Sequence, residues 1–181
     1  MAVSAHQEPE PLRFGDMTAE HLPGVLAIER ASFPTPWSEQ AFVSELTQNA
    51  HARYIVALRG DAVLGYGGMW LILDEAHITN IAVHPAERRQ GLGDAILSEL
   101  ERRALAHGCR GMTLEVRLSN GEAQRLYRRH GFVPRGLRPG YYADTHEDAI
   151  IMWKDDLARP APLAAERRAP GRLGRSGAPS E

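Results

Sequence analysis

Two arginines and two glycines lie directly before a helical pattern in the stretch "HPAERRQGLGDAILSELERRALAHG", residues 84–108. The start of a helix presents unpaired N–H groups and the positive end of the helix dipole, which together attract anions. Gly91 and Gly93 would let the backbone approach an anion closely, and Arg88 and Arg89 would add positive charge. This spacing predicts a site for a phosphate or a pyrophosphate. On its own, a glycine-containing turn with solvated arginines would fit the stretch as well.

Two common classes of phosphate site do not match it. A P-loop needs a lysine directly after its last glycine, and the only lysine of this chain is Lys154, which follows Trp153. A dinucleotide fingerprint needs a third glycine or alanine, but Ile96 occupies the required place after Gly91 and Gly93. The predicted anion site therefore belongs to another class.

The elements that must position this site follow from the hydrophobic pattern. Strands are predicted at residues 12–17, 52–73 (two strands joined by a turn at Arg59–Asp61), 75–85, 109–119, 132–142 and 146–157. Helices are predicted at residues 18–33, 38–49, 92–108 and 120–131. Ser38 and Asn120 are the predicted helix N-caps, and Gly108 and Gly131 the predicted stops. The order β-α-α-β-β-β-α-β-α-β-β predicts one mixed α/β sheet.

Length and composition favour one domain with a short extension at each end. A chain of 181 residues with 43% hydrophobic content can bury one substantial core. Residues 1–10 are interpreted as a flexible lead-in and residues 11–157 as the domain. Residues 158–181 are interpreted as a disordered tail, because Ala, Pro, Gly and Arg dominate it and leave little to bury. The tail could touch RNA or an acidic partner, but a solvated extension is the favoured interpretation.

Charge and cysteine content restrict the partners of the domain. The net charge of −2 gives no reason to expect nucleic acid or an anionic membrane as a partner. A single cysteine, Cys109, allows neither an internal disulfide nor a cysteine zinc site. The histidines show no metal-ligand spacing, so we expect structural histidines and no metal. We find no apolar signal core and no membrane-length apolar run, and we expect a cytoplasmic protein.

Four segments carry a resemblance to a known family. The pattern Arg88-x-x-Gly91-x-Gly93 after a strand ending in "NIAVHP" resembles the acyl-CoA pyrophosphate loop of the GCN5-related N-acetyltransferases (GNAT). Over residues 12–157 the chain resembles, more narrowly, the RimI family, the N-terminal alanine acetyltransferases of a small-subunit ribosomal protein. The segments are "FPTPWSEQAF", "ITNIAVHPAERRQGLG", "LEVRLSNGEAQRLYRRHGF" and "GYYADTHEDAIIM". The resemblance implies the GNAT fold, a sheet of about seven strands with about four helices and a splayed strand pair for acetyl-CoA.

The resemblance also implies which residues bind acetyl-CoA. The pantetheine arm would lie along the backbone of Ile81, Ala82 and Val83, as an added strand would. Main-chain N–H groups would hold the pyrophosphate along the segment Arg88, Arg89, Gln90, Gly91, Leu92, Gly93 and Asp94. Asn120 would cap a helix and also bind the CoA arm. An acidic side chain at Asp94 is unusual for this loop and would repel phosphate, so we expect it to point away.

Two residues match the family's catalytic positions. Glu115 lies mid-strand on the face opposite Leu114 and Val116, where a carboxylate can take the amine proton directly or through water. By the resemblance, Glu115 is the general base and Tyr127 is the general acid that protonates the leaving thiolate. Without the resemblance, Glu115 could be a solvated strand residue and Tyr127 a core aromatic.

The acceptor is the less determined half of the reaction. By the resemblance, its groove would be lined by Trp37, Tyr141, Tyr142, Glu147 and Asp148. Deprotonating a lysine at neutral pH costs roughly 3.5 kcal/mol more than deprotonating a protein N-terminus, which favours an α-amine acceptor. The resemblance implies that the acceptor is the N-terminus of a ribosomal small-subunit protein, and we expect the enzyme to be a monomer. The alternatives are a GNAT enzyme for lysines, other N-termini or small amines, and a non-catalytic CoA-binding protein.

Overall fold

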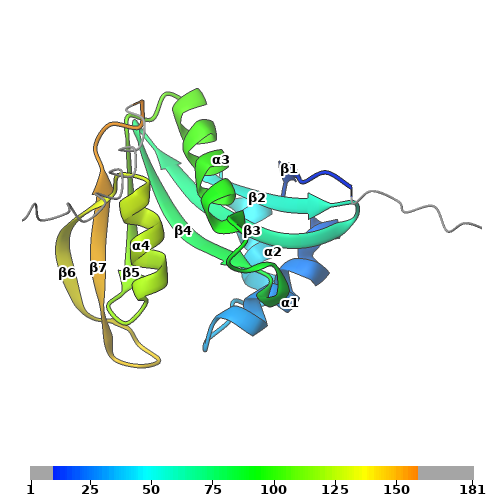
Figure 1. The fold of residues 1–181 in the computed structure, drawn as a ribbon, viewed down its shortest axis with the longest axis horizontal. Helices are drawn as coiled ribbons and strands as arrows, with labels where there is room; N and C mark the ends of the chain where they lie inside the picture. Colours follow the sequence, from blue (N-terminus) through cyan, green and yellow to red (C-terminus); the bar gives the residue numbers. More distant parts are fainter. Residues whose placement is uncertain (1–9, 159–181) are drawn as a thin grey trace, which may run out of the picture.

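Seven strands form one mixed sheet in the computed structural model, which describes residues 10–158 (Figure 1). The strands are β1 (Arg13–Asp16), β2 (Ala52–Arg59), β3 (Ala62–Ile72), β4 (Glu75–Val83), β5 (Gly111–Arg117), β6 (Val133–Tyr142) and β7 (Glu147–Lys154). The helices are α1 (Leu22–Ser32), α2 (Glu39–Gln48), α3 (Leu92–Ala106) and α4 (Gly121–Arg129). Short 3-10 turns lie at Ala19–His21 and Pro85–Glu87. The predicted element order is confirmed, whereas the predicted lead-in and tail lie almost entirely outside the described residues.

The sheet opens between its two parallel strands. The strand order is β1-β2-β3-β4-β5-β7-β6, and every neighbouring pair is antiparallel except β4 and β5. Pairing between β4 and β5 covers only Glu75–Ile78 and Gly111–Leu114. Beyond these residues β4 stays paired with β3 as far as Val83, and β5 stays paired with β7 as far as Arg117. The splayed strand pair implied by the resemblance is therefore present.

A β-bulge lies where the two strands part. On β3, Gly68 pairs with Asn80 and Met69 pairs with Ile78, so Thr79 is an extra residue on β4. Such an insertion bends its strand and increases the local twist. The last β4 residue paired with β5 is Ile78. The bulge therefore bends β4 at the point where it leaves β5.

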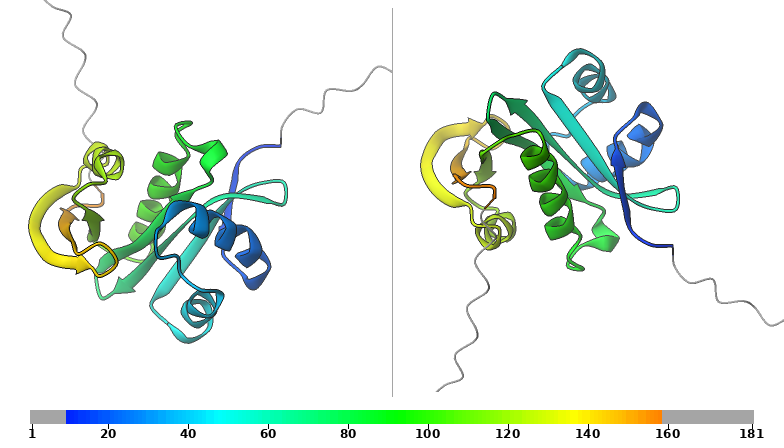
Figure 2. Two further views of the ribbon diagram at one scale, coloured as in Figure 1. Left: turned by 90° about the horizontal axis from the view of Figure 1, so that it is seen from below. Right: turned by 90° about the horizontal axis from the view of Figure 1, so that it is seen from above.

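Helices cover both faces of the sheet and bury two separate cores. Figure 2 shows α3 and α4 on one face and α1 and α2 on the other, with β6 curling around β7. The first core includes Ile96, Leu97 and Leu100 of α3, all fully buried against the sheet. The second includes Ile28 of α1 and Phe42 of α2, also fully buried. Apolar residues at three- and four-residue steps produce these faces, as the sequence pattern predicts.

The two predicted N-caps and the two predicted glycine stops are confirmed, whereas α1 begins at Leu22, after a 3-10 turn, and not at residue 18. Ser38 Oγ accepts a hydrogen bond from the Ala41 N–H at 3.2 Å, and Asn120 Oδ1 accepts one from the Ala123 N–H at 3.0 Å. Gly108 has φ +88° and follows the C-cap His107, where a left-handed residue ends the helix. These caps fix where α2 and α4 begin, and α4 borders both cavities described below.

The single lysine of the chain is buried at the far end of β7. Lys154 Nζ lies 3.0 Å from Glu101 Oε1 of α3, and only 7% of the lysine side chain is exposed. Glu101 Oε2 also lies 3.3 Å from Nδ1 of the buried His130. The pair therefore ties α3 to the end of β7.

Within residues 10–158, no helix has the length and apolar character needed to cross a membrane.

Candidate active site

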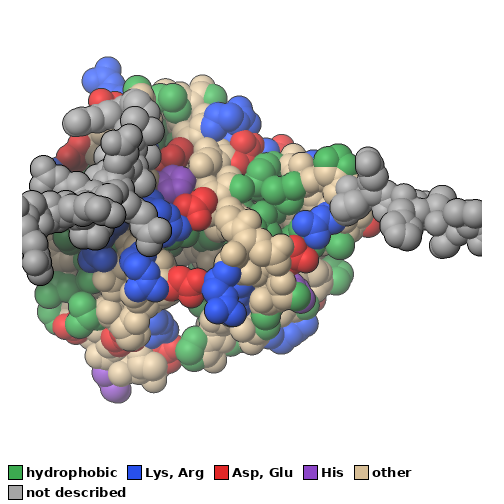
Figure 3. All heavy atoms as spheres, viewed as in Figure 1, with side chains coloured by type: hydrophobic (Ala, Val, Ile, Leu, Met, Phe, Trp, Pro, Cys, Tyr) green, Lys and Arg blue, Asp and Glu red, His purple; other side chains and the backbone are tan. Residues whose placement is uncertain are grey.

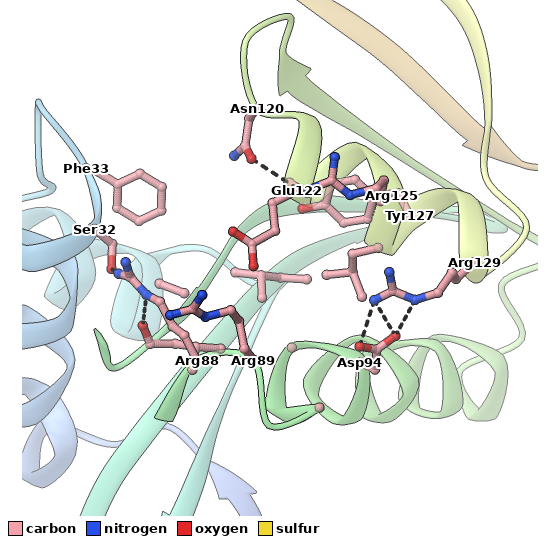
Figure 4. Close-up of a pocket in the computed structure, with 17 residues that line it drawn as sticks. Ser32, Phe33, Arg88, Arg89, Asp94, Asn120, Glu122, Arg125, Tyr127 and Arg129 are labelled. Carbon is pink, nitrogen blue, oxygen red and sulfur yellow. Dashed lines mark hydrogen bonds and ion pairs between the residues drawn. The ribbon is translucent and has the colours of Figure 1, made fainter. Parts of the chain in front are cut away.

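A cavity of about 470 Å³ opens between the α3 N-terminus and α4, beside the part of β4 that has separated from β5 (Figure 4). On the face drawn in Figure 3, charged side chains of both signs surround a hollow near the middle of the molecule. The predicted residues that line the cavity are Ile81, Ala82, Val83, Arg88, Arg89, Gly91, Gly93, Asp94, Asn120 and Tyr127. Residues that lie 46 positions apart in the sequence are thus gathered at one site.

The loop before α3 has the backbone that its glycines predict. Gly91 is the N-cap of α3 with φ +81°, and a Cβ placed there would meet nothing within 4 Å. Conformation rather than space therefore calls for glycine at this position. Arg89 also has a positive φ, +60°, which is uncommon for a residue with a side chain. The loop thus turns sharply just before the unpaired N–H groups of α3.

Arg88 holds this loop in place. Its Nε donates to the Val83 carbonyl at 3.0 Å, and its Nη2 donates to Ser32 Oγ at 2.9 Å. The guanidinium therefore links the end of β4 to the last residue of α1. Arg89 lines the cavity beside it. Both arginines therefore line the cavity, and Arg88 is in addition tied to two neighbouring segments.

Two predicted loop residues turn their side chains elsewhere. Gln90 Nε2 donates to the Ala86 carbonyl at 3.1 Å, and the Leu92 side chain is buried in the core under α3. Neither residue lines the cavity. Any part they take in holding a ligand there is restricted to their main chain.

The Asp94 carboxylate faces α4. Arg129 Nη2 donates to both Asp94 oxygens at 2.9 Å (Figure 4). The Asp94 side chain therefore points away from the loop, as expected, although Asp94 still lines the cavity. Arg125, Arg129 and Glu122 of α4 also line it, and our sequence interpretation did not include them. The repeated arginines of "QRLYRR" are the feature of the sequence that could have predicted a positively charged wall here.

A second cavity of about 610 Å³ adjoins the first on the side of α1 and the β6–β7 turn. Trp37, Tyr141, Tyr142 and Glu147 line it, as expected of the acceptor groove. Asp148 does not line it, because Asp148 Oδ1 accepts a hydrogen bond from the Gly140 N–H at 2.9 Å.

Tyr127 lies where the two cavities meet, since it lines both of them. Its ring packs against Phe132 with 5.8 Å between ring centroids, so the residue is also part of the core. Burial raises the pKa of Tyr127 well above its ordinary value. The phenol is therefore protonated at neutral pH, as a proton donor must be.

Glu115 lies in the second cavity with both oxygens engaged. Its Oε2 is 2.6 Å from His77 Nε2, and its Oε1 is 3.1 Å from Arg138 Nε. Only 6% of the side chain is exposed, so Glu115 is not a solvated strand residue. The hydrogen bond from His77 lowers the pKa of Glu115 below its ordinary value, with added help from the charges of His77 and Arg138 and against the effect of burial. Glu115 is therefore a carboxylate at neutral pH.

The contact between His77 and Glu115 is absent from the sequence interpretation, which assigned structural roles to all histidines. His77 pairs with Thr113 across β4 and β5, which places it diagonally opposite Glu115. The two residues are 38 positions apart. No local pattern reveals this contact, because it depends on which strands are neighbours.

Ion pairs and hydrogen bonds connect the walls of the second cavity. Arg117 Nη2 donates to both oxygens of Asp144, at 3.0 and 2.8 Å. Thr35 Oγ1 donates to Asp144 Oδ2 at 3.2 Å, which joins the α1–α2 loop to the β6–β7 turn. The Ser119 N–H donates to Glu147 Oε1 at 2.6 Å. These contacts hold the walls of the second cavity in position relative to one another.

The buried side chain of Glu29 fixes the α1–α2 loop through a hydrogen bond to its main chain. It is 2% exposed and accepts hydrogen bonds from the Trp37 N–H at 2.9 Å and from the Tyr66 hydroxyl. Burial raises the pKa of Glu29. Glu29 thus holds Trp37, one of the predicted acceptor residues, at the wall of the second cavity.

Across residues 10–158, no group of three or more His, Cys, Asp or Glu side chains is arranged as metal ligands.

Comparisons with known proteins agree on one family. Residues 22–132 match the model of the acetyltransferase (GNAT) family. A Bacillus subtilis (strain 168) protein, provisionally named a [ribosomal protein bS18]-alanine N-acetyltransferase, is 41% identical over 138 residues, which cover 76% of this chain and 91% of that protein. The Escherichia coli (strain K12) enzyme of that name is 38% identical over 135 residues, covering 72% of this chain and 88% of the enzyme.

Solved structures give the same result. The crystal structure of the ribosomal-protein-S18-alanine N-acetyltransferase from Escherichia coli has a TM-score of 0.73 at 33% identity, and covers 87% of this chain and 98% of that chain. Arabidopsis thaliana NAA60 in complex with acetyl-CoA has a TM-score of 0.72 at 19% identity, covering 80% and 98% of the two chains. The second likeness shows the shared fold.

Proposed function

Because this chain belongs to the RimI family of GNAT acetyltransferases, we propose that it transfers the acetyl group of acetyl-CoA to the N-terminal alanine of ribosomal protein bS18. One observation supports the proposal most directly. Tyr127 lines both cavities, and Glu115 lies in the second, so a thioester in the first cavity and an amine in the second would meet between them.

The charges of the two cavities fit the two substrates. Four arginines and two acidic residues line the first cavity, which suits the phosphates of acetyl-CoA. The charged residues lining the second are Glu29, Glu115, Asp144, Glu147 and Arg117. A protonated α-amine would enter this acidic cavity more readily than an anion would.

We propose that acetyl-CoA lies along the free side of β4. The main chain of Ile81, Ala82 and Val83 has no partner in β5, and it would bind the pantetheine arm as another strand would. The loop from Arg88 to Gly93 and the α3 N-terminus would hold the pyrophosphate. Asn120 lines both cavities and would contact the arm near the thioester.

The transfer itself needs a base and an acid. Glu115 would take a proton from the α-ammonium, directly or through water, and the free amine would attack the thioester carbonyl. Tyr127 would protonate the thiolate as it leaves. An α-amine has a reference pKa of about 7.7–8, against about 10.4 for lysine, so one carboxylate base serves it more easily.

A peptide panel tests the acceptor and both roles. It contains the bS18 N-terminal peptide, the same peptide with a blocked α-amine and a free lysine, and peptides with other first residues. We expect acetylation of the free N-terminal alanine alone. Glu115→Gln and Tyr127→Phe should each lower kcat by about 10²-fold or more while binding CoA normally. Glu20→Gln, an exposed glutamate outside both cavities, is the matched control.

Each part of the proposal can be contradicted separately. Acetylation of the lysine peptide would overturn the acceptor assignment and leave the cofactor site standing. Full activity of either variant would remove that residue from the mechanism. Tight CoA binding without turnover of any peptide would favour a non-catalytic CoA-binding protein.

A further inference from the structure

Each turnover of the proposed reaction must release one proton to solvent. A protonated α-amine and acetyl-CoA become an amide and a free thiol, and these products hold one proton fewer than the reactants. Tyr127 protonates the thiolate and regains its proton from the attacking nitrogen. The proton taken first, by Glu115, is the one that has to leave.

Glu115 has little direct access to water. Its side chain is 6% exposed, and a bound peptide would cover the second cavity into which it projects. Arg138 contacts Oε1, and an arginine at neutral pH cannot accept a proton. The other oxygen, Oε2, lies 2.6 Å from His77 Nε2.

We infer that His77 carries the proton from Glu115 to solvent, an inference that rests on the function proposed above. The imidazole has the exposure that Glu115 lacks, since 30% of its side chain is exposed. His77 lines neither cavity, so its exposed part lies outside the space that the two substrates would fill. A proton that reaches His77 can therefore leave while both substrates are bound.

The transfer is a simple relay. In the tautomer with hydrogen on Nδ1, the Nε2 atom of His77 accepts the proton from the Glu115 carboxyl group. The imidazolium then loses its Nδ1 proton to water, which regenerates the carboxylate and leaves Nε2–H donating to it. Exchange of the ring protons with water between turnovers restores the tautomer with hydrogen on Nδ1. Histidine suits this step because one ring nitrogen can accept a proton while the other releases one.

The surroundings hold the ring in line with Glu115. The Trp70 ring lies 6.1 Å from the His77 ring, centroid to centroid, and Trp70 Nε1 donates to Glu45 at 2.6 Å. The charged groups around His77 are thus Glu115 of β5, Glu45 of α2 beyond Trp70, and Arg138 of β6 beyond Glu115. The nearest of them, Glu115, is the relay's other member.

Buffer dependence of turnover tests the relay. Initial rates are measured with saturating acetyl-CoA and bS18 peptide from pH 6 to 9, in low and high buffer, for the wild type, His77→Gln, His77→Ala and His107→Gln. His107 is an exposed histidine at the end of α3 and serves as the control. Gln keeps a hydrogen-bonding group beside Glu115 but cannot carry a proton.

We expect His77→Gln to lower kcat about tenfold in low buffer, with both KM values within about twofold of the wild type. Added imidazole should raise the rate of His77→Ala and leave the wild type and His107→Gln unchanged. A wild-type rate for His77→Gln in low buffer would overturn the relay. Failure of imidazole to raise the rate of His77→Ala would overturn it as well.

Wild-type enzyme and Glu115→Gln, run beside these variants, separate the relay from the proposed function. A wild type that acetylates no N-terminal peptide overturns both. A fully active Glu115→Gln overturns the base assignment and the relay with it. An active wild type, an inactive Glu115→Gln and a fully active His77→Gln overturn the relay alone.

Discussion

Glu115 illustrates how neighbouring residues set the chemistry of one side chain. His77 contacts one of its oxygens and Arg138 contacts the other, and together they keep the carboxylate ionised despite burial. A base held in this way keeps a captured proton only weakly. Release of that proton to solvent then matters as much as its uptake, and His77 is the residue that we infer to carry it.

The pH dependence of activity should follow from these surroundings. The pKa of Glu115 is lowered from 4.5, so the loss of activity caused by protonation of Glu115 should occur below pH 4.5. The rise of kcat/KM between pH 6 and 9 should instead follow the α-amine of the peptide, with a midpoint near its reference pKa of about 7.7–8. The profile should move when the peptide amine is changed. A midpoint of kcat/KM that stays the same when the pKa of the peptide amine is changed would contradict the assignment of this rise to the α-amine.

The same pKa shift predicts a pH-dependent stability. A carboxyl group whose pKa is lower in the folded protein stabilises it above the unfolded pKa and loses that contribution as pH falls through the folded value. The difference in unfolding free energy between the wild type and Glu115→Gln should therefore narrow as pH falls below 4.5. Urea unfolding at several pH values measures it. A difference that does not change with pH would contradict the prediction.

Secondary-structure elements place these residues, and their local signals were mostly readable in the sequence. The caps at Ser38 and Asn120 and the stop at Gly108 were predicted from residue type and are confirmed. The bulge at Thr79 was not predicted, because it is defined by pairing with β3 rather than by its own sequence. The separation of β4 from β5 was anticipated only through the family resemblance.

Substitution of two glycines should separate packing from loop geometry. A Cβ at Gly68 would clash with Cε1 of the buried Tyr54 ring, so Gly68→Ala should cost about 3 kcal/mol of stability or more. Gly91→Ala meets no atom and should cost only about 1 kcal/mol, from its positive φ. Urea unfolding and the KM for acetyl-CoA report the two effects. Gly91→Ala should raise that KM more than its small loss of stability explains.

Arg88→Ala should weaken acetyl-CoA binding by loosening the loop. The side chain ties the loop to Val83 and Ser32. Arg88→Lys keeps the charge but cannot reproduce both contacts in the same geometry. We therefore expect both variants to raise the KM for acetyl-CoA by similar factors. Wild-type behaviour of Arg88→Lys would show instead that the charge alone matters.

At the scale of the whole molecule, two cavities of opposite charge meet at Tyr127. The sheet order brings them together, and that order comes from pairings between distant segments. Most of the residues that the resemblance assigned line one or both cavities, and the exceptions are Gln90, Leu92 and Asp148. The sequence did not reveal His77 or Arg138, because their contacts with Glu115 depend on strand neighbours and on the curl of β6.

Salt should weaken capture of both substrates. Each cavity attracts a substrate of the opposite charge, and salt screens that attraction over about 10 Å at 0.1 M and about 3 Å at 1 M. The kcat/KM values for acetyl-CoA and for the peptide should therefore both fall as NaCl rises, while kcat changes little. A peptide kcat/KM that does not respond to salt would contradict the electrostatic role of the acidic cavity.

The burial of Lys154 has a practical consequence for experiments on this enzyme. The chain has no other lysine, and this ε-amine is paired with Glu101 inside the fold. In mass spectrometry of a reaction mixture, an acetyl-lysine peptide will therefore come from another protein, provided that the enzyme stays folded during the incubation. The folded enzyme therefore adds no background signal to an assay of lysine acetylation, and no lysine-free variant has to be made.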